Sequence, residues 1–207
     1  MCLIIHKPAG ERIPEDLLRA GASLNHDGWG LMGFDTNGKP LVERRSELNI
    51  EELLATERSL RGAEYALHLR RRTRGDTSEF NAHPFRVTDD IYLMHNGTLG
   101  LETATPGRSD TWHLVHRYLR PLEKRWPGLL RDSTLHALLQ IALPPENRVV
   151  LMLTRAKRLV ILNRHHGVEF EGLWLSNARW IDRRLLPLDG IAAPQERSFD
   201  VEELRFL

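Results

Sequence analysis

Residues 1–6, Met1-Cys2-Leu3-Ile4-Ile5-His6, place a cysteine directly before a short apolar segment, and this cysteine is the only one among 207 residues. The segment 3–6 predicts a strand at the start of the chain. Removal of Met1 would leave Cys2 with a free α-amine, whose ordinary pKa of about 7.7 to 8.0 suits it to accept the proton of its own thiol. This is the layout of an N-terminal nucleophile. Start-codon context also puts a cysteine at this position by accident, so position alone decides nothing.

The overall composition excludes recognition by bulk charge. The chain has 29 Lys and Arg against 28 Asp and Glu, a net charge of +1, so no global field directs it to nucleic acid or to a membrane surface. No apolar run approaches the roughly 20 residues of a spanning helix, and the N-terminus lacks the charged lead and apolar length of a signal peptide. We therefore expect a cytoplasmic protein with a reduced thiol, forming one domain over residues 1–207.

The rest of the pattern mixes helices with antiparallel strands. Segments 29–34 and 40–44 flank Asn37-Gly38, and Asn-Gly supplies the positive φ angles of a hairpin turn. At the start of the following helix, Asn49 can cap and Glu52 can reach back. Further strands are expected at 64–70, 90–95, 149–154, 159–163 and 172–176, and further helices at 13–24, from 109 onward, and at 132–143. With no internal repeat, this order supports the α+β class.

Two of the expected strands run directly into polar clusters that suit attack on an amide bond. Residues 68–73 include Arg70, whose guanidinium can clamp a substrate carboxylate with two parallel hydrogen bonds. A solvated basic patch or a phosphate site would explain the same run of arginines. Residues 95–99 include Asn96 and Gly97, and a side-chain amide beside an unhindered backbone N–H can hold the oxyanion of a tetrahedral intermediate. Asn-Gly is also a common turn dipeptide, so a simple turn stays open.

Two further segments are candidates for the same site. Ser109-Asp110 stands at an expected helix start, where the carboxylate could receive a substrate ammonium; ordinary N-terminal capping is the alternative. Residues 73–84 are rich in Gly, Asp, Thr, Ser and Asn and predict a long loop. Such a loop in a compact domain is more often functional than idle.

Taken together and in order, six motifs resemble those of the class II glutamine amidotransferases, whose nucleophile is N-terminal. The motifs are Cys2, residues 25–30 (NHDGWG), 68–73 (HLRRRT), 81–85 (NAHPF), 95–99 (HNGTL) and Ser109-Asp110. The resemblance covers residues 2–112 and is closest to the small stand-alone type. It implies a four-layer αββα sandwich of the N-terminal nucleophile hydrolase type, with Cys2 at the start of a central strand. It implies no cofactor.

For the reaction, the resemblance implies a glutaminase-type thiol amidohydrolase that cleaves the γ-amide of glutamine or of a γ-glutamyl compound. Cys2 would form a γ-glutamyl thioester, and Asn96 and Gly97 would form the oxyanion hole. The implied partners are this small molecule and, as an open option, an ammonia-accepting enzyme in trans. Neither nucleic acid nor a membrane is implied.

For the pocket, the resemblance implies five substrate-binding residues. Arg70 would hold the substrate α-carboxylate, and Asp110 would receive the α-amine. Thr73 and His83 would line the same pocket, and Trp29 would shape it near the nucleophile. A Trp beside glycines is also a good core anchor.

Arg72 departs from the family pattern, which usually has a small residue there. A larger anionic γ-glutamyl substrate would explain it, and so would an ion pair with an acid such as Glu79 or Asp89. Two alternative functions remain: a catalytically silent amino-acid-binding regulatory module of the same fold, and nucleic-acid binding through the arginines of residues 70–74.

The ten histidines raise the question of a metal. His165 and His166 are adjacent, and neighbours on a strand face opposite ways. His113 and His116 have helical spacing that can share a metal, but no third ligand is evident. We therefore expect no metal site.

Overall fold

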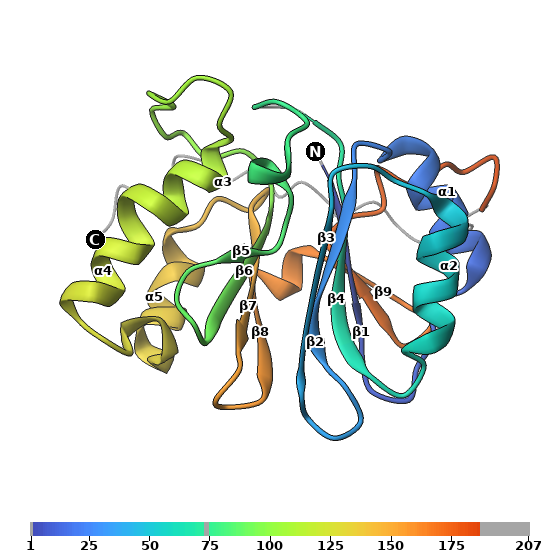
Figure 1. Ribbon diagram of the computed structural model, residues 1–207, viewed down its shortest axis with the longest axis horizontal. Helices are drawn as coiled ribbons and strands as arrows, with labels where there is room; N and C mark the ends of the chain where they lie inside the picture. Colours follow the sequence, from blue (N-terminus) through green and yellow to red (C-terminus); the bar gives the residue numbers. More distant parts are fainter. Residues whose placement is uncertain (1, 73–74, 187–207) are drawn as a thin grey trace, which may run out of the picture.

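The computed structural model describes residues 2–72 and 75–186. Two antiparallel sheets lie face to face, and helices cover the outer side of each sheet (Figure 1). The layers therefore follow the order helices, sheet, sheet, helices. The expected α+β class and four-layer αββα sandwich are confirmed.

Within the described residues, the first sheet has six strands in the order β3-β2-β4-β1-β10-β9. Their bounds are β1 Leu3–Lys7, β2 Trp29–Phe34, β3 Pro40–Arg45, β4 Glu64–Leu69, β9 Val168–Phe170 and β10 Leu173–Leu175. β1 lies between β4 and β10, so Ile5 is opposite both Leu67 and Leu175. The second sheet has the order β5-β6-β7-β8. Its strands are β5 Phe85–Arg86, β6 Ile91–Asn96, β7 Arg148–Leu153 and β8 Arg158–Leu162.

The helices form the two outer layers. α1 (Glu15–Leu24) and α2 (Ile50–Ser59) cover the first sheet, and α3 (Asp110–His113), α4 (Arg120–Arg125) and α5 (Ser133–Ala142) cover the second. A π-helical segment, Leu114–Leu119, joins α3 to α4, and 3-10 turns lie at Glu79–Asn81, Leu129–Arg131 and Arg164–His166. No helix in the described part of the chain is long and apolar enough to cross a membrane.

Helix α2 begins as its sequence predicts, with one difference. Asn49 Oδ1 accepts hydrogen bonds from the backbone N–H groups of Glu51 and Glu52, as a capping residue does. The Glu52 carboxylate pairs with Arg45 at 3.0 Å rather than reaching back to Asn49. The neighbouring strand β3 therefore takes the side chain that a capping box would have used.

The hairpin of β2 and β3 forms at the expected place with a different turn. Gly38 has a φ of +76°, whereas Asn37 is not among the described residues with positive φ. The Asp35 carboxylate accepts from the N–H groups of Asn37 and Lys39, both at 2.8 Å. One left-handed glycine and a carboxylate, rather than two left-handed residues, thus close the hairpin.

In the part of the chain that the structure describes, three buried apolar clusters fill the spaces between the four layers. The first lies between the first sheet and helices α1 and α2, the second between the two sheets, and the third between the second sheet and helices α3 to α5. β1 contributes to two of them, because Leu3 and Ile5 face the helices while Ile4 faces the second sheet. A strand covered on both faces is mostly apolar, which explains the uninterrupted segment 3–5.

Candidate active site

Cys2 and several of the residues predicted around it lie between the two sheets, at one end of the sandwich (Figure 1). Leu3 lies opposite Leu69 in the antiparallel pair of β1 and β4, so the next positions in this register are Cys2 and Arg70. Side chains alternate along a strand, and Cys2 therefore faces the second sheet, as Ile4 does. The start of β1 and the end of β6 lie at the same end of the molecule (Figure 1).

The second sheet meets Cys2 with Asn96, the last residue of β6. The Cys2 backbone N–H donates to Asn96 Oδ1 at 3.1 Å, and Asn96 Nδ2 donates to Ser176 Oγ at 2.7 Å. The Asn96 side chain is thus held at both ends, and the residue is 1% exposed. Because an amide nitrogen carries two hydrogens, one N–H of Asn96 remains for another acceptor.

Gly97 follows Asn96 in a conformation that requires glycine. Its φ is +146°, and a Cβ there would lie 2.3 Å from Asn147 Oδ1. Any side chain would therefore be strained and would clash with Asn147. The three residues predicted as catalytic, Cys2, Asn96 and Gly97, lie together.

The Cys2 sulfur lies against the backbone of Arg71. The Arg71 N–H is 3.4 Å from Sγ, and Sγ is 3.3 Å from the Arg71 carbonyl oxygen. Burial raises the pKa of the Cys2 thiol above its ordinary value; the Arg71 hydrogen bond and the positive charge of Arg70 lower it, but by less. A thiol with a raised pKa needs a base within reach to act as a nucleophile.

Arg70 brings a buried positive charge to the same cluster. The residue is 4% exposed; its backbone N–H donates to Gly28 O, and its Nη2 donates to the carbonyl oxygen of Asp76. Arg70 Nη1 has no hydrogen-bond partner within the described residues. Since an unpartnered buried N–H is costly, this nitrogen is suited to an anionic ligand. Thr73, predicted beside it, lies outside the described residues.

Asp110 is the first residue of α3 and approaches the site from the second sheet's helix layer. Ser109 Oγ caps this helix by accepting from the Trp112 N–H. The Asp110 carboxylate accepts from the N–H groups of Leu99 and Thr111 at 2.7 and 2.8 Å. Its negative charge also raises the pKa of the Cys2 thiol, after the larger effect of burial. Asp110 therefore holds the start of α3 and the Leu99 backbone, and its charge acts on the nucleophile.

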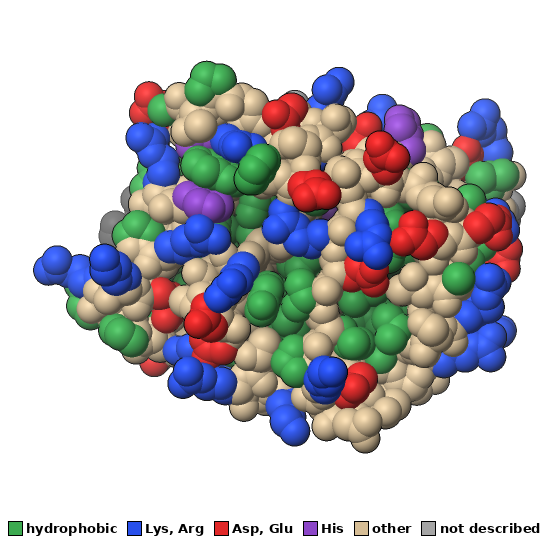
Figure 2. All heavy atoms as spheres, viewed as in Figure 1, with side chains coloured by type: hydrophobic (Ala, Val, Ile, Leu, Met, Phe, Trp, Pro, Cys, Tyr) green, Lys and Arg blue, Asp and Glu red, His purple; other side chains and the backbone are tan. Residues whose placement is uncertain are grey.

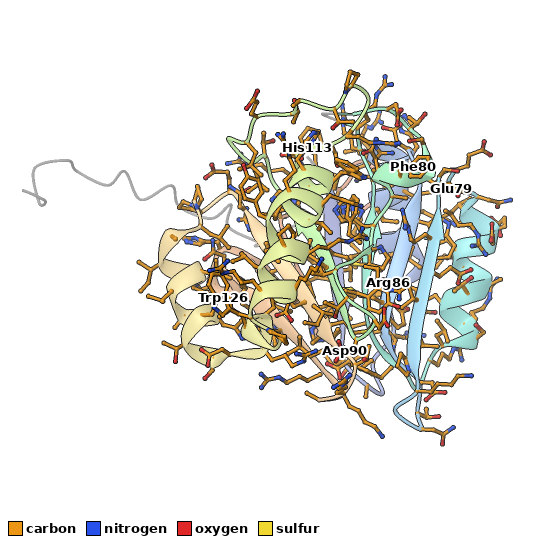
Figure 3. All side chains as sticks on the ribbon, turned by 60° about the vertical axis from the view of Figure 1, so that its left-hand side comes forward. Glu79, Phe80, Arg86, Asp90, His113 and Trp126 are labelled. Atoms are coloured by element: carbon orange, nitrogen blue, oxygen red, sulfur yellow. The ribbon has the colours of Figure 1, made fainter. Side chains whose placement is uncertain are left out.

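Asn81 links the Arg70 side of the site to the Asp110 side. Its Oδ1 accepts from the Ser109 N–H at 2.8 Å, and its Nδ2 donates to the Asp76 carbonyl, which also receives Arg70. In Figure 3, Glu79 and Phe80 of the same 3-10 turn lie at the end of the molecule where His113 of α3 lies. The sequence placed Asn81 in a motif but assigned it no role.

His83 stacks on His68 between the sheets. Their ring centroids are 4.0 Å apart with an interplanar angle of 26°, and neither ring has a hydrogen-bond partner among the described residues. Burial lowers the pKa of His68 to about 3, and it holds the pKa of His83 well below its ordinary value. The charge of Arg70 acts in the same direction on both. Both imidazoles are therefore neutral at physiological pH.

Trp29 does not join the group of side chains around Cys2. It belongs to the apolar cluster that packs against α1 and α2, on the helix side of the first sheet. Gly30, its neighbour, occupies the other face, where a Cβ would lie 2.0 Å from the His83 carbonyl oxygen. Trp29 therefore has the position of a core residue, which was the alternative expectation. Gly30 allows the His83 backbone to approach the sheet.

His95 joins neighbouring parts of the site through two hydrogen bonds. Its Nδ1 lies 2.9 Å from Thr111 Oγ1 and its Nε2 lies 2.8 Å from Asn147 Oδ1. Burial lowers the pKa of His95. This histidine therefore connects β6 to α3 and to the residue that packs on Gly97.

Two further polar residues reach the site from the end of β10. Asn177 Nδ2 donates to the Cys2 carbonyl oxygen at 3.0 Å, and Ser176 Oγ accepts from Asn96. Sequence reasoning missed both. The available signal was a Ser-Asn pair directly after the apolar residues 173–175.

The arginine run that suggested nucleic-acid binding does not form one exposed surface. Arg70 is buried, and Arg71 lies over the Trp180 ring at 4.5 Å. Arg72 is exposed but has no ion-pair partner in the described ranges, where Asp89 pairs with Arg86. On the face drawn in Figure 2, Lys and Arg side chains alternate with Asp and Glu.

The described residues contain no group of three His, Cys, Asp or Glu side chains placed to hold a metal ion. His113 Nε2 accepts from the Thr105 N–H, and His116 stacks on Trp112 with ring centroids 4.1 Å apart. His165 and His166 lie in the 3-10 turn Arg164–His166, between β8 and β9.

Comparison with known proteins connects this geometry to a family. A family model described as "Glutamine amidotransferases class-II" matches residues 17–144. The chain is 32% identical over 154 residues to the glutamine–fructose-6-phosphate aminotransferase (isomerizing) of Salmonella typhi and 31% identical over 156 residues to that of Escherichia coli K12. In both cases the match covers 68% of this chain and 25% of the relative, so the chain spans about a quarter of the length of these relatives.

Among solved structures, the glutamine phosphoribosylpyrophosphate amidotransferase from B. subtilis matches with a TM-score of 0.48 and 19% identity, covering 86% of this chain and 42% of the other. The family model covers more than half of the chain but begins after Cys2. The two antiparallel sheets between helix layers are the N-terminal nucleophile hydrolase fold of the matched family. The chain belongs to the class II glutamine amidotransferases.

Proposed function

We propose that the chain is a thiol amidohydrolase that cleaves the γ-amide of glutamine, or of a γ-glutamyl compound, through a thioester on Cys2. One observation carries the proposal: Cys2 N lies 3.1 Å from Asn96 Oδ1, so the only cysteine and the amide of the Asn-Gly pair meet across the two sheets. A thiol and a pair of potential oxyanion donors are the elements that acyl transfer requires.

The first step needs Met1 to be removed, which turns the Cys2 nitrogen into an α-amine. This amine takes the thiol proton, and the thiolate attacks the γ-carbonyl carbon. The resulting oxyanion accepts from the free N–H of Asn96 Nδ2 and from the Gly97 N–H. The C–N bond then breaks, and ammonia or an amine leaves with the proton held by the α-amine.

The second step regenerates the thiol. Water gives a proton to the α-amine and attacks the γ-glutamyl thioester, the C–S bond breaks, and the sulfur recovers the proton. Glutamate is the product when glutamine is the substrate. Ammonia is either released or taken by an acceptor enzyme in trans.

Two charged side chains would select the amino-acid head group of the substrate. Arg70 Nη1, which has no partner among the described residues, would bind the α-carboxylate. Asp110 already accepts two backbone hydrogen bonds, but each carboxylate oxygen has a second lone pair for the α-ammonium. His83 and Thr73 would line the same pocket. Trp29 would not contact the substrate directly, because its side chain lies in the core on the helix side of the sheet.

The test combines mass spectrometry of the purified protein with an assay of glutamate release from glutamine. Loss of Met1, activity in the wild type and no activity in Cys2→Ala are the expected results. Retention of Met1 in active protein, or full activity of Cys2→Ala, would overturn the proposal. Glutamine binding without any glutamate release would instead indicate a silent binding module.

The substrate class is tested by a second assay. Glutamine, γ-glutamyl amides, γ-glutamyl peptides and γ-glutamyl cysteine conjugates are compared by kcat/KM for glutamate release. The proposal expects activity only with compounds that keep a free α-amine and a free α-carboxylate, because Arg70 and Asp110 would otherwise lack a partner. Equal activity on N-acetylglutamine would contradict this assignment of Asp110.

A further inference from the structure

A serine from the C-terminal half of the chain lies directly behind the proposed oxyanion donor. Ser176 follows β10 and is fully buried, at 0% exposure. Its Oγ lies 2.7 Å from Asn96 Nδ2 and 2.8 Å from the Ile4 backbone nitrogen. Backbone and amide N–H groups only donate, so the Ser176 hydroxyl is the acceptor in both bonds.

These bonds determine which way the Asn96 amide faces. Cys2 N donates to Oδ1 on one side, and Ser176 Oγ accepts from Nδ2 on the other. Turning the amide by 180° would set the two donors, Asn96 Nδ2 and Cys2 N, against each other. The present orientation leaves the second hydrogen of Nδ2 pointing in a fixed direction.

The geometry points to Ser176 as a positioning residue that aims the Asn96 amide at the developing oxyanion without itself touching the substrate. This inference rests on the proposed function. Donors stabilise a transition state most when they are oriented before the charge develops, and Ser176 supplies that orientation. Asn177 adds a donor to the Cys2 carbonyl at 3.0 Å, so the end of β10 holds both the nucleophile and the oxyanion donor.

The inference predicts a specific kinetic change for Ser176→Ala. We expect kcat for glutamine hydrolysis to fall about 10-fold, less than the roughly 10²- to 10³-fold loss when a donor itself is removed. KM for glutamine and the affinity for the product glutamate should stay within about 3-fold of wild type, because neither Arg70 nor Asp110 contacts Ser176 in the described structure.

The experiment separates positioning from a general structural role by a double-mutant cycle. Ser176→Ala is introduced into the wild type and into Asn96→Ala, and single-turnover glutamate release is measured well below the unfolding midpoint of each variant. Ser23→Ala, which removes an exposed hydroxyl bonded to Asp182, serves as the matched control. If Ser176→Ala fails to fold after losing the partner of Ile4 N, Ser176→Cys replaces it, since a thiol keeps the shape but accepts hydrogen bonds weakly.

A loss in kcat of at least 3-fold that disappears in the Asn96→Ala background, with unchanged glutamate affinity, supports the inference. A smaller loss, an equal loss in the Asn96→Ala background, or a parallel loss of glutamate affinity overturns it. An inactive wild type overturns the proposed function and this inference with it. An active wild type with an unaffected Ser176 variant overturns the inference alone.

Discussion

Strands β4 and β10 lie on either side of β1, and they contribute to the site in different ways. β4 leads into Arg70, which belongs to a recognisable motif, whereas β10 leads into Ser176 and Asn177, which belong to none. Both nevertheless contact the start of β1 or its partner Asn96. A motif consists of residues that are close together in sequence, whereas a hydrogen bond joins residues that are close together in space. The residues that support a site can therefore lack any local sequence signature.

The largest expected effect tests whether β4 and β10 contribute equally to the stability of the core. Leu67 of β4 and Leu175 of β10 are both opposite Ile5, and both are buried in the same apolar cluster. We expect Leu67→Ala and Leu175→Ala each to lower the free energy of unfolding by about 2 to 5 kcal/mol. Urea denaturation measures both, and the exposed Leu138→Ala is the control. If the free energies of unfolding of the two variants differ by more than about 2 kcal/mol, the two strands do not contribute equally.

Arg70→Gln tests whether the residue that follows β4 acts on substrate binding rather than on kcat. Removing a buried cation that would bind a carboxylate costs about 2 to 5 kcal/mol, so we expect kcat/KM for glutamine to fall about 100-fold, mainly through KM. For the Ser176 variant we expect a lower kcat instead. Steady-state kinetics measure both effects, with Arg19→Gln, which removes an exposed ion pair to Glu15, as the control. A change in KM below 3-fold for Arg70→Gln would remove Arg70 from substrate binding.

Asn177→Asp tests whether the residues after β10 hold the nucleophile in place. The substitution keeps an oxygen that accepts from the N–H groups of Arg179 and Trp180 but replaces the donor to the Cys2 carbonyl. We expect kcat to fall about 5-fold, because a typical hydrogen bond contributes about 1 kcal/mol. Glutamate-release kinetics measure the change, and Asn37→Asp in the β2–β3 turn serves as the control. An unchanged kcat would mean that this bond does not hold the nucleophile in its reactive position.

The smallest expected effect is the loss of stability at low pH that His68 of β4 causes. The pKa of His68 is about 3 in the folded protein against 6.5 when solvated, so below pH 6.5 only the unfolded chain gains the proton. Stability therefore falls as the pH drops, by about 1 kcal/mol between pH 6.5 and 5.5 from this histidine. His68→Met should reduce the slope of unfolding free energy against pH, whereas the exposed His165→Asn should retain it. A wild-type slope in His68→Met would contradict the assignment.

The order of elements and the α+β class followed from local pattern. The segments 29–34 and 40–44 that flank the Asn-Gly turn, and the apolar segments at 90–95 and 149–154, correspond to β2, β3, β6 and β7 within one or two residues. Those signals are local, because side-chain period and turn chemistry act over a few residues. Trp29 was harder, since the sequence around it fits a pocket wall and a core anchor equally.

The order of one cysteine, an Asn-Gly pair and two charged side chains along the chain was enough to indicate a family. Which residues these side chains contact became known only from the fold. Cys2 meets Asn96 at a separation of 94 positions, Asn96 meets Ser176 at 80, and Cys2 meets Asn177 at 175. Strand register and the stacking of the two sheets set these contacts, and both depend on burial of the whole core. No local period in the sequence records which buried faces will meet.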